Sequence, residues 1–320
     1  MLASVLVDWE LALAALGIGI VVGLTGMGGG ALMTPTLVLF FNVPPLTAVS
    51  SDLVTSAVMK PVGSLVHMRH GTVHWKLVLW LMIGSVPAAF GGSLVIAAVG
   101  PLTGVQAFVK TALGCVLLLA AALIFVRAYI GMRNRAMERR AGTTTKRQAS
   151  AEVRVRVVPT LIIGIVGGLM VGLTSVGSGS MIIISLMLLY PLLAMNKLVG
   201  TDLVQAVPLV IAAALGHLLF GEVDWAVVLP LIIGSVPGAW IGAQFSSKIP
   251  GGYVRRALAV VLLAAGLKLL NVDNVTVLVA AVAAVVAGTF GWMALRRTHG
   301  LPITLRHERR LRESSDDRAN

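Results

Sequence analysis

One glycine-rich stretch occurs twice in this chain, and each copy lies between strongly apolar segments. Residues 23–30 read GLTGMGGG and residues 172–179 read GLTSVGSG, so both follow the pattern G-L-T-x-x-G-x-G. Glycine lets the backbone turn sharply and leaves its N–H groups accessible. In a bilayer, such backbone is tolerated only where protein buries it or where it lines a water-filled cavity. The flanking apolar segments are Leu11–Val22, Ala31–Phe41, Val157–Val171 and Met181–Leu189.

The composition places the chain in a membrane. Of its 320 residues, 57% are hydrophobic and 12% are charged, and the mean hydropathy is +0.94. A soluble domain carries about a quarter charged residues. The apolar runs are long and continuous, which favours membrane helices over the alternating strands of a barrel. The sequence therefore predicts an all-α polytopic membrane protein built as one bundle.

The positive charge is concentrated in two clusters that flank apolar spans. Nine Lys and Arg residues lie between Arg127 and Arg156, and seven lie between Arg296 and Arg318. Such clusters report membrane orientation through the positive-inside rule. No folded basic domain accompanies them, so we do not expect a nucleic-acid partner despite the net charge of +12. Anionic lipid headgroups are the expected partners of these segments.

The two halves of the chain are related by duplication. At an offset of 150 residues, Asp52–Gly92 aligns without gaps on Asp202–Gly242. The two segments share His67 with His217, Trp75 with Trp225, and the tetrapeptide Gly-Ser-Val-Pro that starts at 84 and 234. The glycine stretches align at an offset of 149. We therefore expect a first membrane repeat, a basic cytoplasmic linker, a second membrane repeat, an extra transmembrane helix and a basic cytoplasmic tail. Their boundaries are 1–130, 131–156, 157–270, 271–295 and 296–320.

The glycine-broken segments are too short for two crossings and long for one. Leu11–Phe41 has 31 residues, whereas one crossing needs about 20. A re-entrant hairpin whose tip reaches mid-membrane fits this length. With re-entrant hairpins, the basic linker and the C-terminus fall in the cytoplasm and the N-terminus falls outside, as the charge bias requires. Each repeat then consists of a hairpin and three transmembrane helices, an odd number of crossings, so the two repeats are predicted to be inverted.

Two acids lie within the predicted spans, at equivalent positions of the repeats. Asp52 follows Ser51, and Asp202 follows Thr201. A carboxylate inside a membrane is costly enough to be a functional hypothesis by default. We expect Asp52 and Asp202 to exchange protons, with the two hydroxyl residues in support. The alternative is a structural role, as a helix cap or a bond to the hairpin tip.

The glycine stretches are the predicted binding site for a small anion. Backbone N–H groups at the start of a helix attract anions, and nearby hydroxyls add donors. Lys60 lies in mid-span, opposite Val210 of the second repeat, and can neutralise an anion or pair with Asp202. Close helix packing by small residues is the alternative. The predicted substrate-binding residues are Thr25, Gly26, Gly28, Gly29, Gly30, Lys60, Thr174, Gly177, Ser178, Gly179 and Ser180.

Other chemistries find little support in the sequence. Gly26–Gly30 lacks the Gly-Lys-Ser/Thr of a phosphate-binding loop, and no soluble strand precedes it. His67, His70 and His74 have a spacing that could bind a metal, but they lie in a basic turn and only His67 is repeated. A single cysteine, Cys115, excludes an intramolecular disulfide. We expect no cofactor, no metal and no enzymatic activity.

These motifs together resemble the TauE/SafE family of sulfite and organosulfonate exporters. The resemblance covers roughly Val22 to Leu270 and rests on the doubled glycine stretch, the segments around Asp52 and Asp202, and the two Gly-Ser-Val-Pro tetrapeptides. It implies a permease of the bacterial inner membrane that exports sulfite or small organosulfonates.

The expected function is thus a secondary transporter of small anions that works by alternating access, with proton coupling. An anion channel and an uptake permease for another small anion are the alternatives. A homodimer remains open, since nothing in the sequence fixes the oligomeric state.

Overall fold

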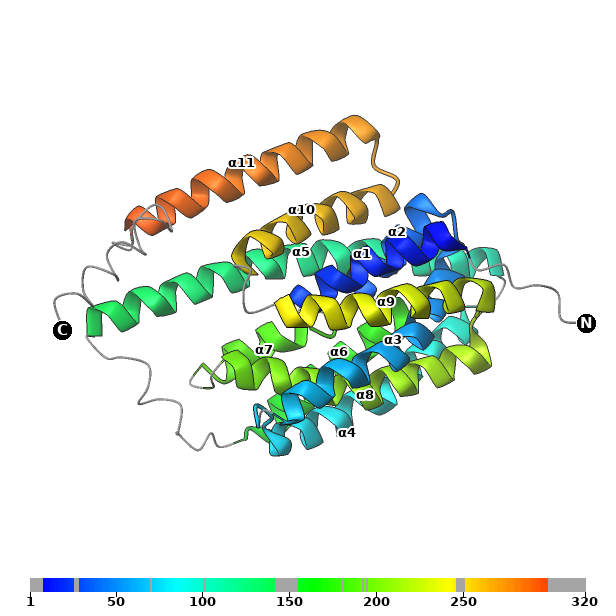
Figure 1. Ribbon diagram of the computed structural model, residues 1–320, viewed down its shortest axis with the longest axis horizontal. Helices are drawn as coiled ribbons and strands as arrows, with labels where there is room; N and C mark the ends of the chain where they lie inside the picture. The colour runs from blue at the N-terminus through cyan, green and yellow to red at the C-terminus, as the bar shows by residue number, and fades with distance from the viewer. Residues whose placement is uncertain are drawn as a thin grey trace, which may run out of the picture.

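Every regular element in the described part of the chain is an α-helix (Figure 1). The computed structural model describes residues 8–25, 29–69, 71–99, 102–141, 155–179, 181–191, 193, 195–245 and 251–298. The predicted all-helical fold is confirmed. The helices are α1 (Trp9–Thr25), α2 (Gly30–Phe40), α3 (Pro45–Arg69), α4 (Trp75–Ala98), α5 (Leu102–Ala141), α6 (Val157–Thr174), α7 (Met181–Leu189), α8 (Met195–Phe220), α9 (Trp225–Phe245), α10 (Gly251–Leu269) and α11 (Asn274–Thr298).

The outer surface of the bundle is apolar, as expected of a membrane protein. Leu79, Ile83, Ile162 and Leu278 are all at least half exposed, and a soluble protein rarely exposes so much apolar surface. Five described helical segments are long and apolar enough to cross a membrane: Trp75–Ala98, Thr103–Arg127, Val157–Thr174, Asn196–Phe220 and Trp225–Phe245.

Helix α3, predicted as the crossing Ala48–Val66, is not one of these five. Its length is sufficient, but Asp52, Ser56 and Lys60 repeat every four residues along one face, and all three are buried. This polar face turns inward and lowers the hydropathy of α3, while Val58, Val62 and Leu65 form an exposed apolar face.

The helices on either side of each glycine stretch form a hairpin that returns to its starting end. In the second repeat, the Tyr190 hydroxyl just beyond α7 lies 2.6 Å from the Thr160 hydroxyl in the first turn of α6. In the first repeat, Leu11 of α1 and Leu37 of α2 belong to one buried cluster. Both α1 and α6 therefore enter the bundle and stop inside it, although α6 is long enough to span a bilayer.

Each hairpin packs against the other repeat. Helix α1 lies along α9, and α6 lies along α4 (Figure 1). The backbones touch: a Cβ atom added at Gly234 would lie 2.0 Å from the Ala12 carbonyl oxygen, and one at Gly172 would lie 2.1 Å from that of Ala89. The repeated Gly-Ser-Val-Pro segments of α4 and α9 supply these close contacts, as small residues do in membrane helix pairs.

Helices α3 and α8 are antiparallel. Ser50 near the start of α3 contacts His217 near the end of α8, and Gly200 near the start of α8 contacts Thr72 just beyond α3. Helices α5 and α10 are also antiparallel, because Gly114 contacts both Gly266 and Leu270, and Lys110, a turn earlier in α5, bonds to Asn271.

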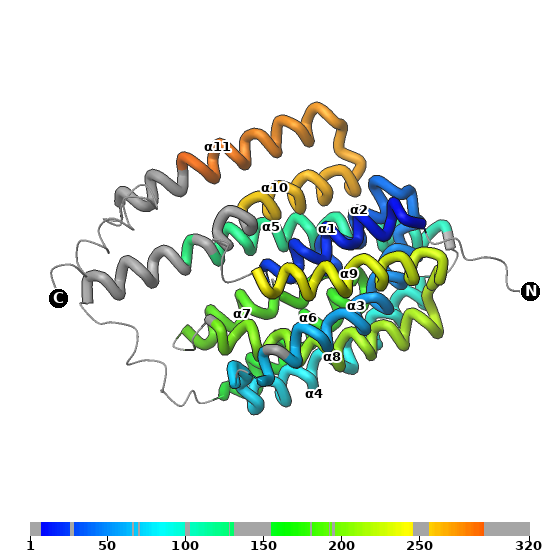
Figure 2. The backbone as a smooth tube through the Cα atoms, in the orientation of Figure 1, coloured from blue at the N-terminus to red at the C-terminus, as the bar shows by residue number. Residues whose placement is uncertain are grey.

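Helices α5 and α11 extend beyond the paired helices of the two repeats. Helix α5 continues to Ala141, into the segment predicted as a linker, and the remainder of that segment up to residue 154 lies outside the described residues. Helix α11, which has no counterpart in the first repeat, packs mainly on α10 and lies at the edge of the bundle (Figure 2).

The interlocked helix contacts predict opposite effects for two adjacent glycines of α4. A Cβ atom at Gly92 would lie 2.8 Å from the Gly172 carbonyl carbon, whereas one at Gly91 meets nothing within 4 Å. We expect Gly92→Ala to lower the free energy of unfolding by about 1–3 kcal/mol through overpacking. Gly91→Ala should be neutral or raise it by up to about 1 kcal/mol. Thermal unfolding midpoints of the purified proteins measure both, and equal midpoints would contradict the close approach of α4 and α6.

Candidate functional site

The tips of the two hairpins meet inside the bundle. Gly30 begins α2, and a Cβ atom placed on it would lie 2.0 Å from the carbonyl oxygen of Ser175, which ends α6. Only glycine allows this approach, so the third glycine of Gly28–Gly30 is needed for tip contact. The sequence predicted that the two glycine stretches contribute to one site, and Gly30 and Ser175 are the residues that join them.

Asp52 links both tips to α3. Its Oδ2 atom accepts one hydrogen bond from the Thr34 hydroxyl of α2 at 2.9 Å and another from the Ser175 hydroxyl at 2.6 Å. The side chain is 1% exposed. A buried carboxylate needs such partners, because an unpaired charge in an apolar interior is strongly destabilising. These contacts are the bond to the hairpin tip that the sequence left open beside proton exchange, and both roles of Asp52 stay predictions.

Ser175 is held in a conformation that L-residues rarely adopt. Its φ of 60° lies in the left-handed region, where a residue with a Cβ costs roughly 1–2 kcal/mol. Glycine stands at the equivalent position of the first repeat, Gly26, which lies outside the described residues. The strain at Ser175 is offset by a backbone bond to Val171 at 2.7 Å and by the hydroxyl bond to Asp52.

Asp202 occupies the equivalent position on α8 but has a different environment. Its Oδ1 atom accepts a hydrogen bond from Gln205 Nε2 at 3.0 Å, and Gln205 Oε1 accepts one from Ser85 at 3.1 Å. Its Oδ2 atom is buried and has no hydrogen-bond partner among the described residues. The repeat explains the difference, since the counterparts of Thr34 and Ser175 are Ile183 and Gly26, which carry no hydroxyl.

Lys60 brings a buried cation to the second tip. Its ammonium group donates a hydrogen bond to the Ser178 hydroxyl at 2.7 Å, and the side chain is 5% exposed. The charge of Asp202 acts on it more strongly than that of Asp52. Lys60 and Asp52 are eight residues apart on α3, about 12 Å along the helix axis, so the lysine lies between the two acids without bonding to either within the described residues.

Arg127 is a buried charged residue that the sequence analysis did not select. It lies on α5, is 6% exposed, and its charge acts on Asp202 more weakly than that of Lys60 does. We grouped it with the basic linker because eight more Lys and Arg residues follow it. Its position inside the apolar run Val105–Tyr129 was the signal that could have identified it.

The two predicted threonines are bonded within their own helices. Thr25 donates to the Val21 carbonyl oxygen at 2.8 Å, and Thr174 donates to that of Met170 at 2.7 Å. Such bonds to the preceding turn are common for threonine. Their roles in substrate binding stay predictions, whereas Ser178, also among the predicted residues, lies beside the Lys60 ammonium group.

The remaining predicted glycines shape the tips. Gly177 and Gly179 have φ values of 139° and 92°, which only glycine adopts readily. The Gly29 carbonyl accepts the backbone N–H groups of Leu32 and Met33 at the start of α2. Gly26, Gly28 and Ser180 lie outside the described residues.

Ser51 and Thr201, which precede the two acids, each bond to the turn just before a helix of the other repeat. The Ser51 hydroxyl accepts a hydrogen bond from the Asp224 backbone N–H at 3.3 Å, and the Thr201 hydroxyl accepts one from that of His74 at 3.0 Å. Asp224 and His74 are themselves equivalent, one residue before α9 and α4. Ser51 and Thr201 thereby fix α3 and α8 relative to the opposite repeat.

The histidines of the basic turn bond locally. His67 Nδ1 lies 3.0 Å from the Thr72 hydroxyl, and His74 Nδ1 accepts the Leu77 backbone N–H at 3.3 Å; His70 lies outside the described residues. Within the part of the chain that the structure describes, no three His, Cys, Asp or Glu side chains gather as metal ligands would.

Comparison with known proteins yields a family and a set of relatives. The family model described as "Sulfite exporter TauE/SafE" matches residues 11–269. The chain is 37% identical over 265 residues to "Probable membrane transporter protein YjnA" of Bacillus subtilis (strain 168), covering 81% of this chain and 98% of that protein. It is 28% identical over 260 residues to "Probable membrane transporter protein YdhB" of the same organism, covering 79% and 96%. No solved structure matches the chain significantly.

The Ser175 geometry predicts that two substitutions there differ in effect. Ser175→Ala removes the bond to Asp52 and keeps the strained backbone, whereas Ser175→Gly removes the bond and relieves the strain. We expect both to lower stability, because a hydrogen bond to a charged group contributes about 1.5–3 kcal/mol. The alanine variant should be less stable than the glycine variant by about 1 kcal/mol. Thermal midpoints of the two purified variants provide the measurement, and a glycine variant that is the less stable one would contradict the assignment.

Proposed function

The chain belongs to the sulfite exporter TauE/SafE family of membrane transporters, and from this premise we propose that it carries a small oxyanion through the meeting point of its two hairpin tips. Sulfite or an organosulfonate is the cargo that the family description favours. In this proposal, the protein is a secondary transporter of the bacterial inner membrane and exports its cargo.

The observation that carries this proposal is the buried Lys60–Ser178 pair. A lysine ammonium group has three N–H donors, and the bond to Ser178 occupies one of them. A buried cation beside a hydroxyl and flexible glycine backbone offers an oxyanion both charge and hydrogen bonds. Gly177 and Gly179, on either side of Ser178, add backbone N–H groups at the same tip.

The charge balance of the site favours proton coupling. Four ionisable side chains are buried around the tips: Asp52, Lys60, Arg127 and Asp202. In their ionised forms these charges sum to zero, so an entering anion would leave an uncompensated negative charge in a low-dielectric interior. A proton on Asp202 restores neutrality, and the protonated Oδ2 atom, which has no partner among the described residues, could donate a hydrogen bond to the anion. We assign proton exchange to Asp202, while Asp52 keeps its bonds to both tips.

The same proposal includes the membrane topology. We propose two inverted repeats, each a re-entrant hairpin with three crossings, with α11 as an additional crossing. The antiparallel pairs α3 with α8 and α5 with α10 support inversion. The basic linker and the C-terminus are placed in the cytoplasm and the N-terminus outside, and alternating access would arise when one hairpin and its partner helix move against the other pair.

Removal of the Lys60 charge is the direct test. Lys60→Gln shortens the side chain by one bond and keeps an N–H donor, but it loses the charge-assisted interaction with an anion. We expect saturable sulfite flux into proteoliposomes to fall by about 10- to 100-fold, since such interactions contribute about 1.5–3 kcal/mol. Lys76→Gln, at the exposed start of α4, is the matched control and should leave flux unchanged. Wild-type flux in Lys60→Gln, or flux that never saturates in the wild type, would favour a different pathway or a channel.

Proton coupling predicts different behaviour for the two repeat-related acids. Asp202→Asn cannot change its charge, so we expect a pH gradient to lose its effect on sulfite accumulation while exchange of sulfite across the membrane persists. Asp52→Asn should weaken the tip contacts and lower the thermal midpoint, yet the protein that remains folded should still respond to the gradient. The measurement is accumulation in proteoliposomes with and without a pH gradient. Accumulation that stays gradient-driven in Asp202→Asn would rule out its proposed role.

A further inference from the structure

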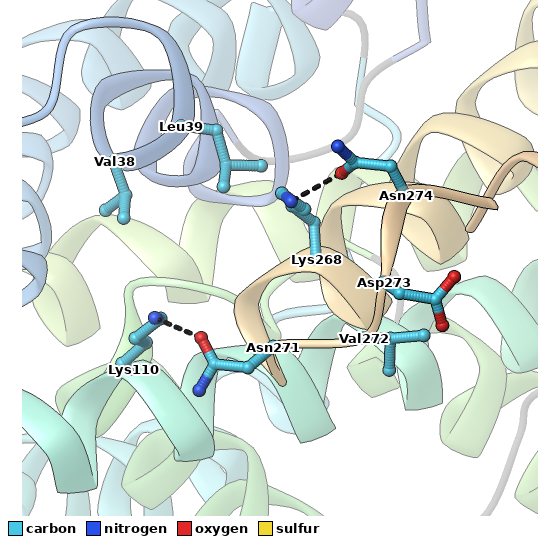
Figure 3. Close-up of a pocket in the computed structure, with 8 residues that line it drawn as sticks. All are labelled: Val38, Leu39, Lys110, Lys268, Asn271, Val272, Asp273 and Asn274. Carbon is cyan, nitrogen blue, oxygen red and sulfur yellow. Dashed lines mark hydrogen bonds between the residues drawn. The ribbon is translucent and has the colours of Figure 1, made fainter. Parts of the chain in front are cut away.

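A second cationic site lies away from the hairpin tips, between α2, α5, α10 and the start of α11. An open cavity of about 480 Å³ is lined there by Val38, Leu39, Lys110, Lys268, Asn271, Val272, Asp273 and Asn274 (Figure 3). We call it the Lys110–Lys268 pocket. Cavities of a few hundred Å³ with apolar walls and a few polar groups are the usual form of small-ligand sites.

Both lysines of this pocket are bonded to neutral side chains. Lys110 donates to Asn271 Oδ1 at 2.7 Å, and Lys268 donates to Asn274 Oδ1. Among the described residues, no carboxylate lies within ion-pair distance of either ammonium group. Each lysine uses one of its three donors in these bonds, and each asparagine keeps its side-chain NH₂ group as a donor.

The acid of the pocket is engaged elsewhere. Asp273 Oδ2 accepts the backbone N–H of Thr276 at 2.8 Å, which caps the first turn of α11. These bonds to Thr276 hold the pKa of Asp273 below its ordinary value, so the carboxylate stays ionised at the helix start. Figure 3 shows its oxygens directed away from both ammonium groups.

The backbone at Asn271 is strained, and its side chain serves the pocket. Asn271 ends α10 with a φ of 61°, a position that glycine fills most easily. The bonds Asn271 N to Lys268 O and Val272 N to Leu267 O complete the helix end. Glycine would satisfy the same backbone without strain but could not bind Lys110. The residue present thus gives Lys110 an amide oxygen to bond.

The Lys110–Lys268 pocket lies near an acidic residue of the bundle. Gln106, one turn before Lys110, donates a hydrogen bond to Glu222 in the turn before α9. The pocket therefore lies toward the end of the bundle that carries Glu222. On the topology proposed above, this end faces outward, where lysine is disfavoured. Two lysines that line one open cavity there suit an anionic ligand.

We propose that the Lys110–Lys268 pocket binds one oxyanion group, either the phosphate of an anionic lipid headgroup or a free oxyanion. The two ammonium groups supply the charge, the Asn271 and Asn274 amides supply further donors, and Val38, Leu39 and Val272 form an apolar wall. The wall includes the end of α2, whose first turns carry Gly30 and Thr34 at the tip contact. A bound oxyanion would thereby stabilise the returning arm of the first hairpin.

The first test measures stabilisation by sulfate in a Lys60→Gln background, where the tip site has lost its cation. Full-length protein in an uncharged detergent is titrated with sodium sulfate and with sodium chloride at equal ionic strength. We expect sulfate to raise the thermal midpoint more than chloride does, and the added pair Lys110→Gln and Lys268→Gln to weaken the apparent affinity at least about 10-fold, as loss of a charged contact implies. The matched control is Lys76→Gln with Lys197→Gln, two lysines at the opposite end of the bundle.

The second test needs no change at Lys60 and separates the two sources. Wild-type protein and the Lys110→Gln/Lys268→Gln variant are compared by native mass spectrometry from micelles with equal phosphatidylglycerol and phosphatidylcholine. Preferential retention of phosphatidylglycerol by the wild type alone identifies a lipid headgroup, and a sulfate effect without such retention identifies a free oxyanion. No preference in either test, or a preference that survives the double variant, overturns the proposal. Sulfite flux that depends on Lys60 is a separate outcome, so either proposal can fail alone.

Discussion

A single buried carboxylate stabilises the contact between the two halves of this protein. Asp52 accepts hydrogen bonds from Thr34 on the returning arm of one hairpin and from Ser175 at the tip of the other. Both tips end inside an apolar bundle, where unpaired backbone and polar groups are expensive. The bonds to Asp52 and the glycine-mediated contact of Gly30 with Ser175 fix the tips against each other, and this geometry is what presents Ser178 to Lys60.

The two repeats make similar helix contacts but carry different polar side chains around the hairpin tips. The turn contacts of Ser51 and Thr201 are reciprocal, as are the pairs α1 with α9 and α4 with α6. In contrast, Asp52 has two hydroxyl partners while one oxygen of Asp202 has none among the described residues, and Lys60 faces Val210 in the alignment. The helix contacts are thus alike in the two halves, whereas the buried polar side chains around the tips differ.

Much of the fold follows from local pattern, and much of the site does not. Apolar runs and glycine breaks predicted arms that end at Val22 and Val171 and resume at Ala31 and Met181. In the structure the helices end at Thr25 and Thr174 and resume at Gly30 and Met181. The partners of Asp52 could not be predicted, because Ser175 is 123 residues away in the chain and only tertiary packing brings them together. Arg127 was missed for the opposite reason: its neighbours in sequence suggested a solvent-exposed cluster, whereas α5 continues past it and buries it.

Because each hairpin packs against the other half of the chain, the order of synthesis affects how the protein folds. Helices α3 and α4 emerge from the ribosome well before α6, so the acid at position 52 enters the lipid without the serine that later satisfies it. Until the C-terminal half is synthesised and inserted, the glycines of α4 that contact α6 stay exposed. The buried polar side chains of the N-terminal half lack their partners during the same time. Neither half is a folding unit on its own, and a chain severed in the basic linker would recover its structure only if both pieces were supplied together.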